Sequence, residues 1–292
     1  MSRAYEAFKQ SAFVQHAKRA VLGNNGGLYV RDRAVPGVVN LEYSHKLNLG
    51  DTLSPVIVNW MLDRRGMSLS APVGQTKHLL ALGSLLGRGI FDATVWGSGI
   101  LEVSTLPRLK HQKGVRSYDI RAVRGPKTRD VLLDYGFPCP AVYGDPGVLL
   151  PLISPAHSAA PSTGPVGVIF HRTTGLSGLE LPRGCKRISI ETSDYQQFVD
   201  ELMSCSRVVS ESLHGVILAE SYGVPARAFL VGNRVSSCSF KYEDWYASTG
   251  RRETAFAHSL EEVFDQASLP VPELEPMRQA LMETFPYDLW DA

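Results

Sequence analysis

The sequence predicts an α/β protein in two halves, each built on a mostly parallel sheet. Short apolar strands alternate with helical patterns, and the alternation restarts after one segment rich in Pro, Ser and Ala. The 292 residues suffice for two domains of ordinary size. We therefore divide the chain into an N-terminal α/β domain (1–150), a linker (151–165) and a C-terminal α/β domain (166–292).

The N-terminal half opens with a helical pattern at 4–21, whose apolar residues fall loosely on one face. That face either packs on its own domain, as most such stripes do, or docks on a membrane or a partner. Strands and helices follow in alternation. We predict strands at 38–43, 78–82, 93–96, 118–123 and 141–143, and helices at 55–64 and 127–134.

The C-terminal half repeats this logic after the linker. We predict strands at 166–170, 187–190, 207–210 and 225–230, and helices at 195–204, 213–222, 260–267 and 273–284. The last helix is expected to pack back on the N-terminal domain. Because open parallel sheets bind ligands at the carboxyl ends of their strands, we expect the ligand cleft between the two halves.

Composition narrows the class of protein. The formal net charge of +1 gives no overall field for nucleic acid or an anionic membrane. Four widely spaced cysteines indicate free thiols in a reducing compartment. No signal peptide and no apolar run of ~18 residues is recognisable, so a cytoplasmic location is expected. Neither HExxH nor a DxD pair is present, so we expect no metal and no cofactor.

The segment Ser-Glu-Ser-Leu-His-Gly at 210–215 is the most informative motif. It follows an apolar strand, and Ser212 is a good N-cap, which puts His214 in the first turn of a helix. Free amides and the positive end of the helix dipole favour a phosphate or carboxylate at such a place. Gly215 removes a side chain where a ligand could approach. The alternative is that His214 is a structural histidine.

Two glycine-containing loops are further candidates. Asn48, Gly50 and Asp51 lie in a loop before the helix at 55–64, where Asp51 or Ser54 could instead simply cap that helix. Gly97, Ser98 and Gly99 follow the strand at 93–96, where they could let backbone approach a ligand or form an ordinary turn.

Local positive charge is the last signal. The stretch 108–129 is rich in Lys and Arg in an otherwise neutral chain, and much of it is expected to be a solvated face. Arg124 stands at a strand end and is expected to point at the cleft, where its planar guanidinium suits phosphate or carboxylate. His171 and Arg172 end the first strand of the second half and face the same cleft.

Taken together, these segments resemble the polysaccharide pyruvyl transferase family, in particular the ketal pyruvate transferases of xanthan-type exopolysaccharides. The matching stretches run in order from about residue 45 to the C-terminus. They are NLGDTLS at 48–54, VWGSGI at 95–100, VRGPKTR at 123–129, YGDPG at 143–147, SLHGVILAESYGVP at 212–225, KYEDWY at 241–246 and FPYDLW at 285–290.

The resemblance implies two Rossmann-like domains facing a cleft, like the B-type glycosyltransferase fold. It implies phosphoenolpyruvate as donor, a lipid-linked oligosaccharide as acceptor, and work at the cytoplasmic face of the inner membrane. His214 is then the general acid, and Arg124 binds the donor's phosphate or carboxylate. Asp51, or Glu211 as the alternative, accepts the hydroxyl proton. The remaining implied donor residues are Ser212, Leu213, Gly215, His171 and Arg172, and those on the acceptor or cleft side are Asn48, Gly50, Gly97, Ser98 and Gly99.

This chain departs from the family pattern at two places, since some relatives carry arginine where Ser212 stands and often proline before the position of His171. Two other functions stay open. One is a nucleotide-sugar glycosyltransferase on the same fold, and the other is a non-catalytic subunit of an exopolysaccharide assembly.

Overall fold

A computed structural model describes residues 34–87, 92–102, 106, 109–110, 113–114, 116–171, 179–231, 234–251 and 256–291. The helix predicted at 4–21 and the predicted site residue Arg172 lie outside the described residues.

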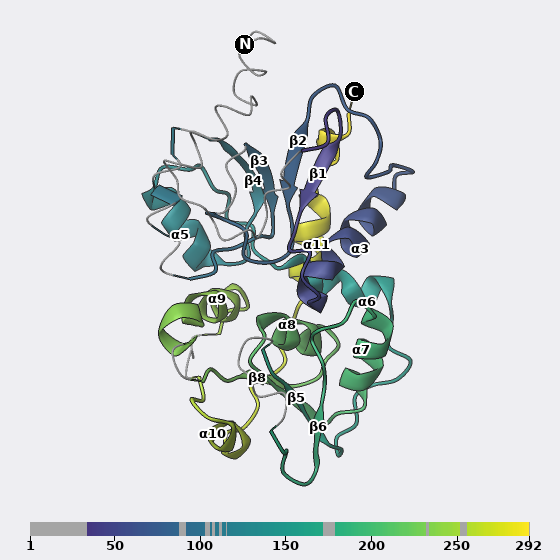
Figure 1. Cartoon of the computed structure of the whole chain (residues 1–292), viewed down its shortest axis with the longest axis vertical. Helices are drawn as coiled ribbons and strands as arrows, with labels where there is room; N and C mark the ends of the chain where they lie inside the picture. The colour runs from purple at the N-terminus through teal and green to yellow at the C-terminus, as the bar shows by residue number, and fades with distance from the viewer. Residues whose placement is uncertain are drawn as a thin grey trace.

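Two four-stranded parallel sheets organise the chain, which confirms the α/β class (Figure 1). The N-terminal sheet has the order β1-β2-β3-β4, and the C-terminal sheet has the order β6-β5-β7-β8. All neighbouring strands in both sheets pair in parallel. The strands are β1 (Val39–Glu42), β2 (Lys77–Leu80), β3 (Ala93–Trp96), β4 (Tyr118–Ala122), β5 (Val166–Ile169), β6 (Cys185–Arg187), β7 (Arg207–Ser210) and β8 (Ala226–Ala228).

Helices connect and cover the strands. Several begin where the sequence supplies a cap: Asp194 and Ser259 accept hydrogen bonds from the amides of Gln197 and Glu262 at the starts of α7 and α10. The helices are α3 (Leu49–Asp63), α5 (Pro126–Asp134), η2 (Pro146–Leu149), α6 (Leu150–Ile153), α7 (Tyr195–Met203), α8 (Leu213–Ser221), α9 (Arg234–Ser248), α10 (Leu260–Asp265), α11 (Glu275–Glu283) and η4 (Tyr287–Leu289).

The structure differs from the predicted elements at five places. The predicted loop at 48–54 is instead the cap and first turns of α3, with Pro55 inside the helix. The segment 141–143 forms only an isolated bridge, and β6 begins at Cys185 rather than at residue 187. The linker begins within α6, and the remainder, 154–165, has no helix or strand. Helix α9 was not predicted, because its first residues include several serines and a β-branched valine that favour helix only weakly.

The C-terminal segment returns to the N-terminal sheet, where Figure 1 shows yellow α11 among the elements of the other half. The indole N–H of Trp96 donates to the carbonyl of Leu281 at 2.9 Å. Lys77 Nζ donates to the Leu289 carbonyl at 2.8 Å. The ring of Phe285 meets that of Trp96 edge-on, with centroids 4.8 Å apart. The largest apolar cluster therefore contains side chains from both halves of the chain.

A buried carboxylate ties α8 to α9. Glu220, 2% exposed, accepts from the indole N–H of Trp245 at 2.9 Å and from both Nη atoms of Arg251. Burial raises the pKa of the Glu220 carboxyl, and the hydrogen bonds from Arg251 and Trp245 oppose that rise. This network fixes the helix that carries His214 against its neighbour.

Candidate active site

The start of α8 lies at the carboxyl end of β7, as the sequence predicts. Ser212 is its N-cap, with an extended backbone, and the hydroxyl of Ser210 both accepts from the Ser212 amide at 3.0 Å and donates to the Ser212 carbonyl at 2.8 Å. A Cβ on Gly215 would lie 2.3 Å from Ser210 Oγ. Gly215 thus makes room for the tight strand-to-helix turn, whereas the sequence suggested room for a ligand.

Within the part of the chain that the structure describes, the first amides of α8 are not used by the protein itself. Among the described residues, the N–H groups of Leu213, His214 and Gly215 have no hydrogen-bond acceptor, and the first bond into the helix is from Val216 to Ser212. Unsatisfied amides at a helix start carry a partial positive charge. Leu213 is 4% exposed, and its side chain packs in the core. Its backbone amide is therefore the only polar group that this residue offers to a ligand.

The imidazole of His214 sits between two other segments. Its side chain is 14% exposed, and its Nε2 lies 3.6 Å from Oδ2 of Asp145. On the other side the ring packs against the backbone of Gly50, because a Cβ there would lie 1.8 Å from Nδ1. The side chain is therefore at the meeting point of α8, η2 and the start of α3 rather than enclosed in the core.

Asp145 is a residue of this site that sequence reasoning missed. Its side chain is fully buried, and Oδ1 accepts from the amide of Gly147 at 2.9 Å, which caps η2. The segment 143–147 was part of the family resemblance, but no role was given to the aspartate. A signal was present, since Asp-Pro-Gly after an apolar segment is typical of a capped turn that fixes a carboxylate.

The predicted residues of α3 have different surroundings. Asn48 is the N-cap and accepts from the Gly50 amide at 3.1 Å, and the Leu49 amide donates to the carbonyl of Ile190 at 2.8 Å. Asn48 and Ile190 therefore accept the hydrogen bonds of two amides that a ligand at the start of α3 would need. Asp51 is half-buried in the first turn, with Oδ1 3.7 Å from the position a Cβ on Gly83 would take.

Arg124 lies in a different environment from the one that the sequence suggested. It is fully buried, and its guanidinium donates to Asp244 Oδ2 at 3.1 Å, to Ser84 Oγ at 2.7 Å and to the Ile100 carbonyl at 2.6 Å. Asp244, on α9, also accepts from the amide and hydroxyl of Thr128. Arg124 therefore joins α9 to the loop after β3, and these protein contacts take the place of the open cleft expected around it.

The Gly97-Ser98-Gly99 turn is also filled by protein. All three residues are buried. A Cβ on Gly97, whose φ is +85°, would lie 2.3 Å from Pro146, and one on Gly99 would lie 2.5 Å from Arg124 Cζ. Ser98 Oγ donates to the Gly83 carbonyl at 3.0 Å. The glycines allow close protein packing, whereas the sequence suggested an approach path for a ligand.

The end of β5 brings His171 to the loop before α8. The His171 amide donates to Oε2 of Glu211 at 3.1 Å, and Glu211 itself is fully buried. The structure thus groups His214, Asp145, Gly50, Ser212, Glu211 and His171 around the carboxyl end of β7. Arg124 is buried in an adjoining cluster, since it bonds to Ser84, whose neighbour Gly83 faces Asp51.

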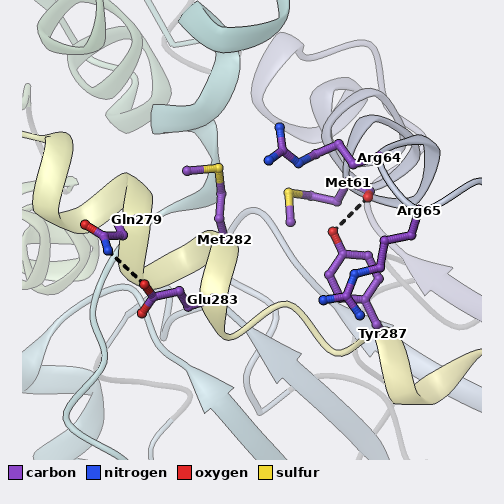
Figure 2. Close-up of a pocket in the computed structure, with 7 residues that line it drawn as sticks. All are labelled: Met61, Arg64, Arg65, Gln279, Met282, Glu283 and Tyr287. Carbon is purple, nitrogen blue, oxygen red and sulfur yellow. Dashed lines mark hydrogen bonds between the residues drawn. The ribbon is translucent and has the colours of Figure 1, made fainter.

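One cavity of about 530 Å³ lies elsewhere, between the end of α3 and α11 (Figure 2). Arg65 stacks over the ring of Tyr287, 3.6 Å from its centroid, and the Tyr287 hydroxyl donates to the Met61 carbonyl. Met61 is eleven residues beyond Gly50 on the same helix, roughly 16 Å at 1.5 Å per residue. None of the predicted site residues lines this cavity.

Neither a cluster of metal-binding side chains nor a membrane-spanning helix is found among the described residues. No group of three or more His, Cys, Asp or Glu side chains is arranged to hold a metal ion among them. No helix in the same ranges is long and apolar enough to cross a membrane.

A family match and one named relative agree with the resemblance. The family described as Polysaccharide pyruvyl transferase matches residues 86–233. An uncharacterized protein of Acanthamoeba polyphaga mimivirus is 24% identical over 70% of this chain and 71% of its own length. The Succinoglycan biosynthesis protein ExoV of Rhizobium meliloti is 27% identical over 59% of this chain and 54% of its own length. A crystal structure of an uncharacterized Klebsiella pneumoniae protein aligns with a TM-score of 0.46 and 12% identity, over 89% of this chain and 100% of that one.

Proposed function

Because the chain belongs to the polysaccharide pyruvyl transferase family, we propose that it transfers the pyruvyl group of phosphoenolpyruvate to two hydroxyls of a sugar, forming a ketal and releasing phosphate. The observation that carries this proposal is the position of His214, a partly exposed imidazole in the first turn of α8, beside three helix-start amides available to an anion.

The donor is an enol phosphate with up to three negative charges. The amides at the start of α8 supply fixed donors for its phosphate or carboxylate. Its methylene carbon must gain a proton before the neighbouring carbon can be attacked, and histidine is the usual proton donor near neutral pH. The bound anion favours the protonated imidazole and so outweighs the opposing effect of the helix dipole.

Proton transfer from His214 to the methylene carbon converts it into a methyl group and leaves cationic character on the adjacent carbon. A sugar hydroxyl attacks that carbon and loses its proton to a base. Phosphate then leaves, and a second hydroxyl of the same sugar closes the ketal and returns its proton to the imidazole of His214, while the proton taken by the base is released to solvent. Asp51 is the base that we favour, because its side chain is only half-buried, whereas Glu211 is fully buried and accepts from the His171 amide.

Arg124 takes a supporting role in this proposal. Its contacts with Asp244, Ser84 and Ile100 hold the loop after β3 rather than an open anion site. The positive charge that accompanies the donor comes from protonated His214 and from the start of α8. The acceptor in this proposal is a lipid-linked oligosaccharide on the cytoplasmic face of the membrane. The similarity to a succinoglycan biosynthesis protein supports the polysaccharide nature of the acceptor.

The two parallel sheets support a B-type glycosyltransferase arrangement, in which each sheet belongs to one Rossmann-like domain and the acceptor enters between them. The start of α8 and the start of α3 would then present donor and acceptor to each other.

Phosphate release from phosphoenolpyruvate across a panel of acceptor glycans tests the function directly. Carbon label from the donor should appear in the glycan, with no turnover of uridine or guanosine diphosphate sugars. His214→Ala should lower kcat by roughly 10²–10⁴, the loss expected for a general acid. Full activity in that variant, or label transfer only from a nucleotide sugar, would contradict the proposal.

A further inference from the structure

We propose that Asp145 is a positioning residue for His214: its buried carboxylate holds Nε2–H and thereby leaves Nδ1 as the nitrogen that delivers the proton. This inference rests on the proposed function for its role in turnover. The pairing itself is a property of the resting protein that can be tested without any substrate.

The geometry assigns the two carboxylate oxygens different tasks. Oδ1 is fixed by the Gly147 amide at 2.9 Å. Oδ2 is 3.6 Å from Nε2 of His214, and neither of these two atoms has a hydrogen-bond partner among the described residues. A buried carboxylate oxygen without a donor is unfavourable, and this imidazole nitrogen is the group placed to supply one.

The separation of 3.6 Å is longer than a hydrogen bond, which requires about 2.7–3.2 Å. Catalytic hydrogen bonds are often long in the resting enzyme and shorten when substrate binds. Protonation of the imidazole adds a charge that attracts the carboxylate, so a small movement of the ring toward Asp145 completes the bond.

The choice of nitrogen follows from burial. Nε2 is one of the buried side-chain atoms without a hydrogen-bond partner among the described residues, whereas Nδ1 is not one of them and faces Gly50 at the start of α3. A histidine whose one nitrogen is bonded to a carboxylate presents the other in a fixed orientation. Nδ1 is therefore the nitrogen that meets the donor's methylene carbon.

Other charged groups near the ring are accounted for. Asp51 lies on α3, the helix that packs against the ring, and its Oδ1 points toward Gly83. Glu211, in the loop before α8, accepts from the His171 amide. Asp145 is the carboxylate that the structure directs at the ring.

Asp145→Asn is the decisive variant, because the amide oxygen still caps η2 while an N–H₂ group replaces Oδ2 and forces the opposite tautomer. We expect kcat to fall by roughly 10²–10⁴, as when a histidine-orienting aspartate becomes asparagine. The falling limb of the kcat–pH profile should move to lower pH. Asp194→Asn is the matched control, since Asp194 is also a helix cap but is exposed and far from any histidine contact, and it should leave kcat and the pH profile unchanged.

Nitrogen-15 NMR of histidine-labelled protein gives a readout independent of turnover, with the His214 signal identified by its loss in His214→Gln. Wild type should show the Nε2–H tautomer when neutral, and Asp145→Asn should show Nδ1–H. A wild-type Nδ1–H tautomer, or unchanged kcat in Asp145→Asn, would overturn the inference. If wild type does not turn over phosphoenolpyruvate, the proposed function fails, and the tautomers still decide the pairing.

Discussion

Gly50 lies directly against the imidazole of His214, so closely that a Cβ at residue 50 would stand 1.8 Å from Nδ1 and 2.2 Å from Cγ. The two residues come from the first turns of α3 and α8, in different halves of the chain. The contact therefore couples the position of the proposed general acid to the start of the N-terminal helix.

Gly50→Ala should displace the imidazole and lower kcat for phosphate release by at least about tenfold, because a misplacement near 1 Å can cost up to ~10² in rate. Alanine is favoured in helices, so the melting temperature should fall little. Gly74→Ala is the matched control, as nothing lies within 4 Å of its added Cβ. Unchanged kcat in Gly50→Ala would contradict a catalytic role for the His214 imidazole in this position.

The buried pair of Arg124 and Asp244 should matter for stability. Asp244→Ala leaves a buried guanidinium without its partner, and we expect a loss of about 3–5 kcal/mol in the free energy of unfolding, measured by urea denaturation. Arg124→Lys should also lower the free energy of unfolding, because a lysine ammonium cannot donate hydrogen bonds to Asp244, Ser84 and Ile100 at the same time. A selective rise in KM for phosphoenolpyruvate at unchanged stability would instead support the donor-binding role that the sequence suggested.

Cys139 should be unreactive in the native protein. Burial raises the pKa of its thiol to about 12, so almost none is thiolate near neutral pH. Alkylation by iodoacetamide should be slow at pH 7.5 and accelerate as pH rises toward 12. Because the folded pKa lies above the unfolded value, the associated stability is present below about pH 8.5 and is lost as pH rises through the folded pKa. Peptide mass spectrometry should find the partly exposed Cys185 and Cys238 modified before Cys139, and early modification of Cys139 would contradict this.

The C-terminal aromatic residues should contribute strongly to stability. Phe285 is 4% exposed and packs between Trp96 and Trp290. Phe285→Ala should therefore cost about 3–5 kcal/mol in urea unfolding. Tyr287→Phe removes only the hydrogen bond to the Met61 carbonyl and should cost about 1 kcal/mol. Equal effects of the two substitutions would show that the segment is not part of the core.

The sequence predicted the parallel sheets and the start of α8 because both are encoded locally. Alternating apolar runs define the strands, and Ser212 before an apolar helix marks its cap. The start of α3 was placed too late because the small and polar residues at 48–54 suggested a loop, whereas Asn48 caps the helix and leaves Pro55 inside it.

The errors at the site arise from contacts between distant segments. Arg124 and Asp244 are 120 residues apart, and no local pattern shows that one neutralises the other in the interior. Asp145 meets His214 only through the packing of η2 on α8. The local sequence pattern shows which polar residues lie at the ends of strands. Which of these residues form pairs with one another depends on the folding of distant segments.

Helices α9 and α11 of the C-terminal half contact the N-terminal half, and this determines how the protein should respond to proteolysis between the halves. Residues 157–159 and 162–164 are exposed and lack regular structure, which makes them a natural target for limited proteolysis. Yet α9 is bonded to Arg124 and α11 is packed on Trp96, so a nicked molecule should hold together as a non-covalent complex. Expressed separately, each piece would expose an apolar surface that only the other can cover.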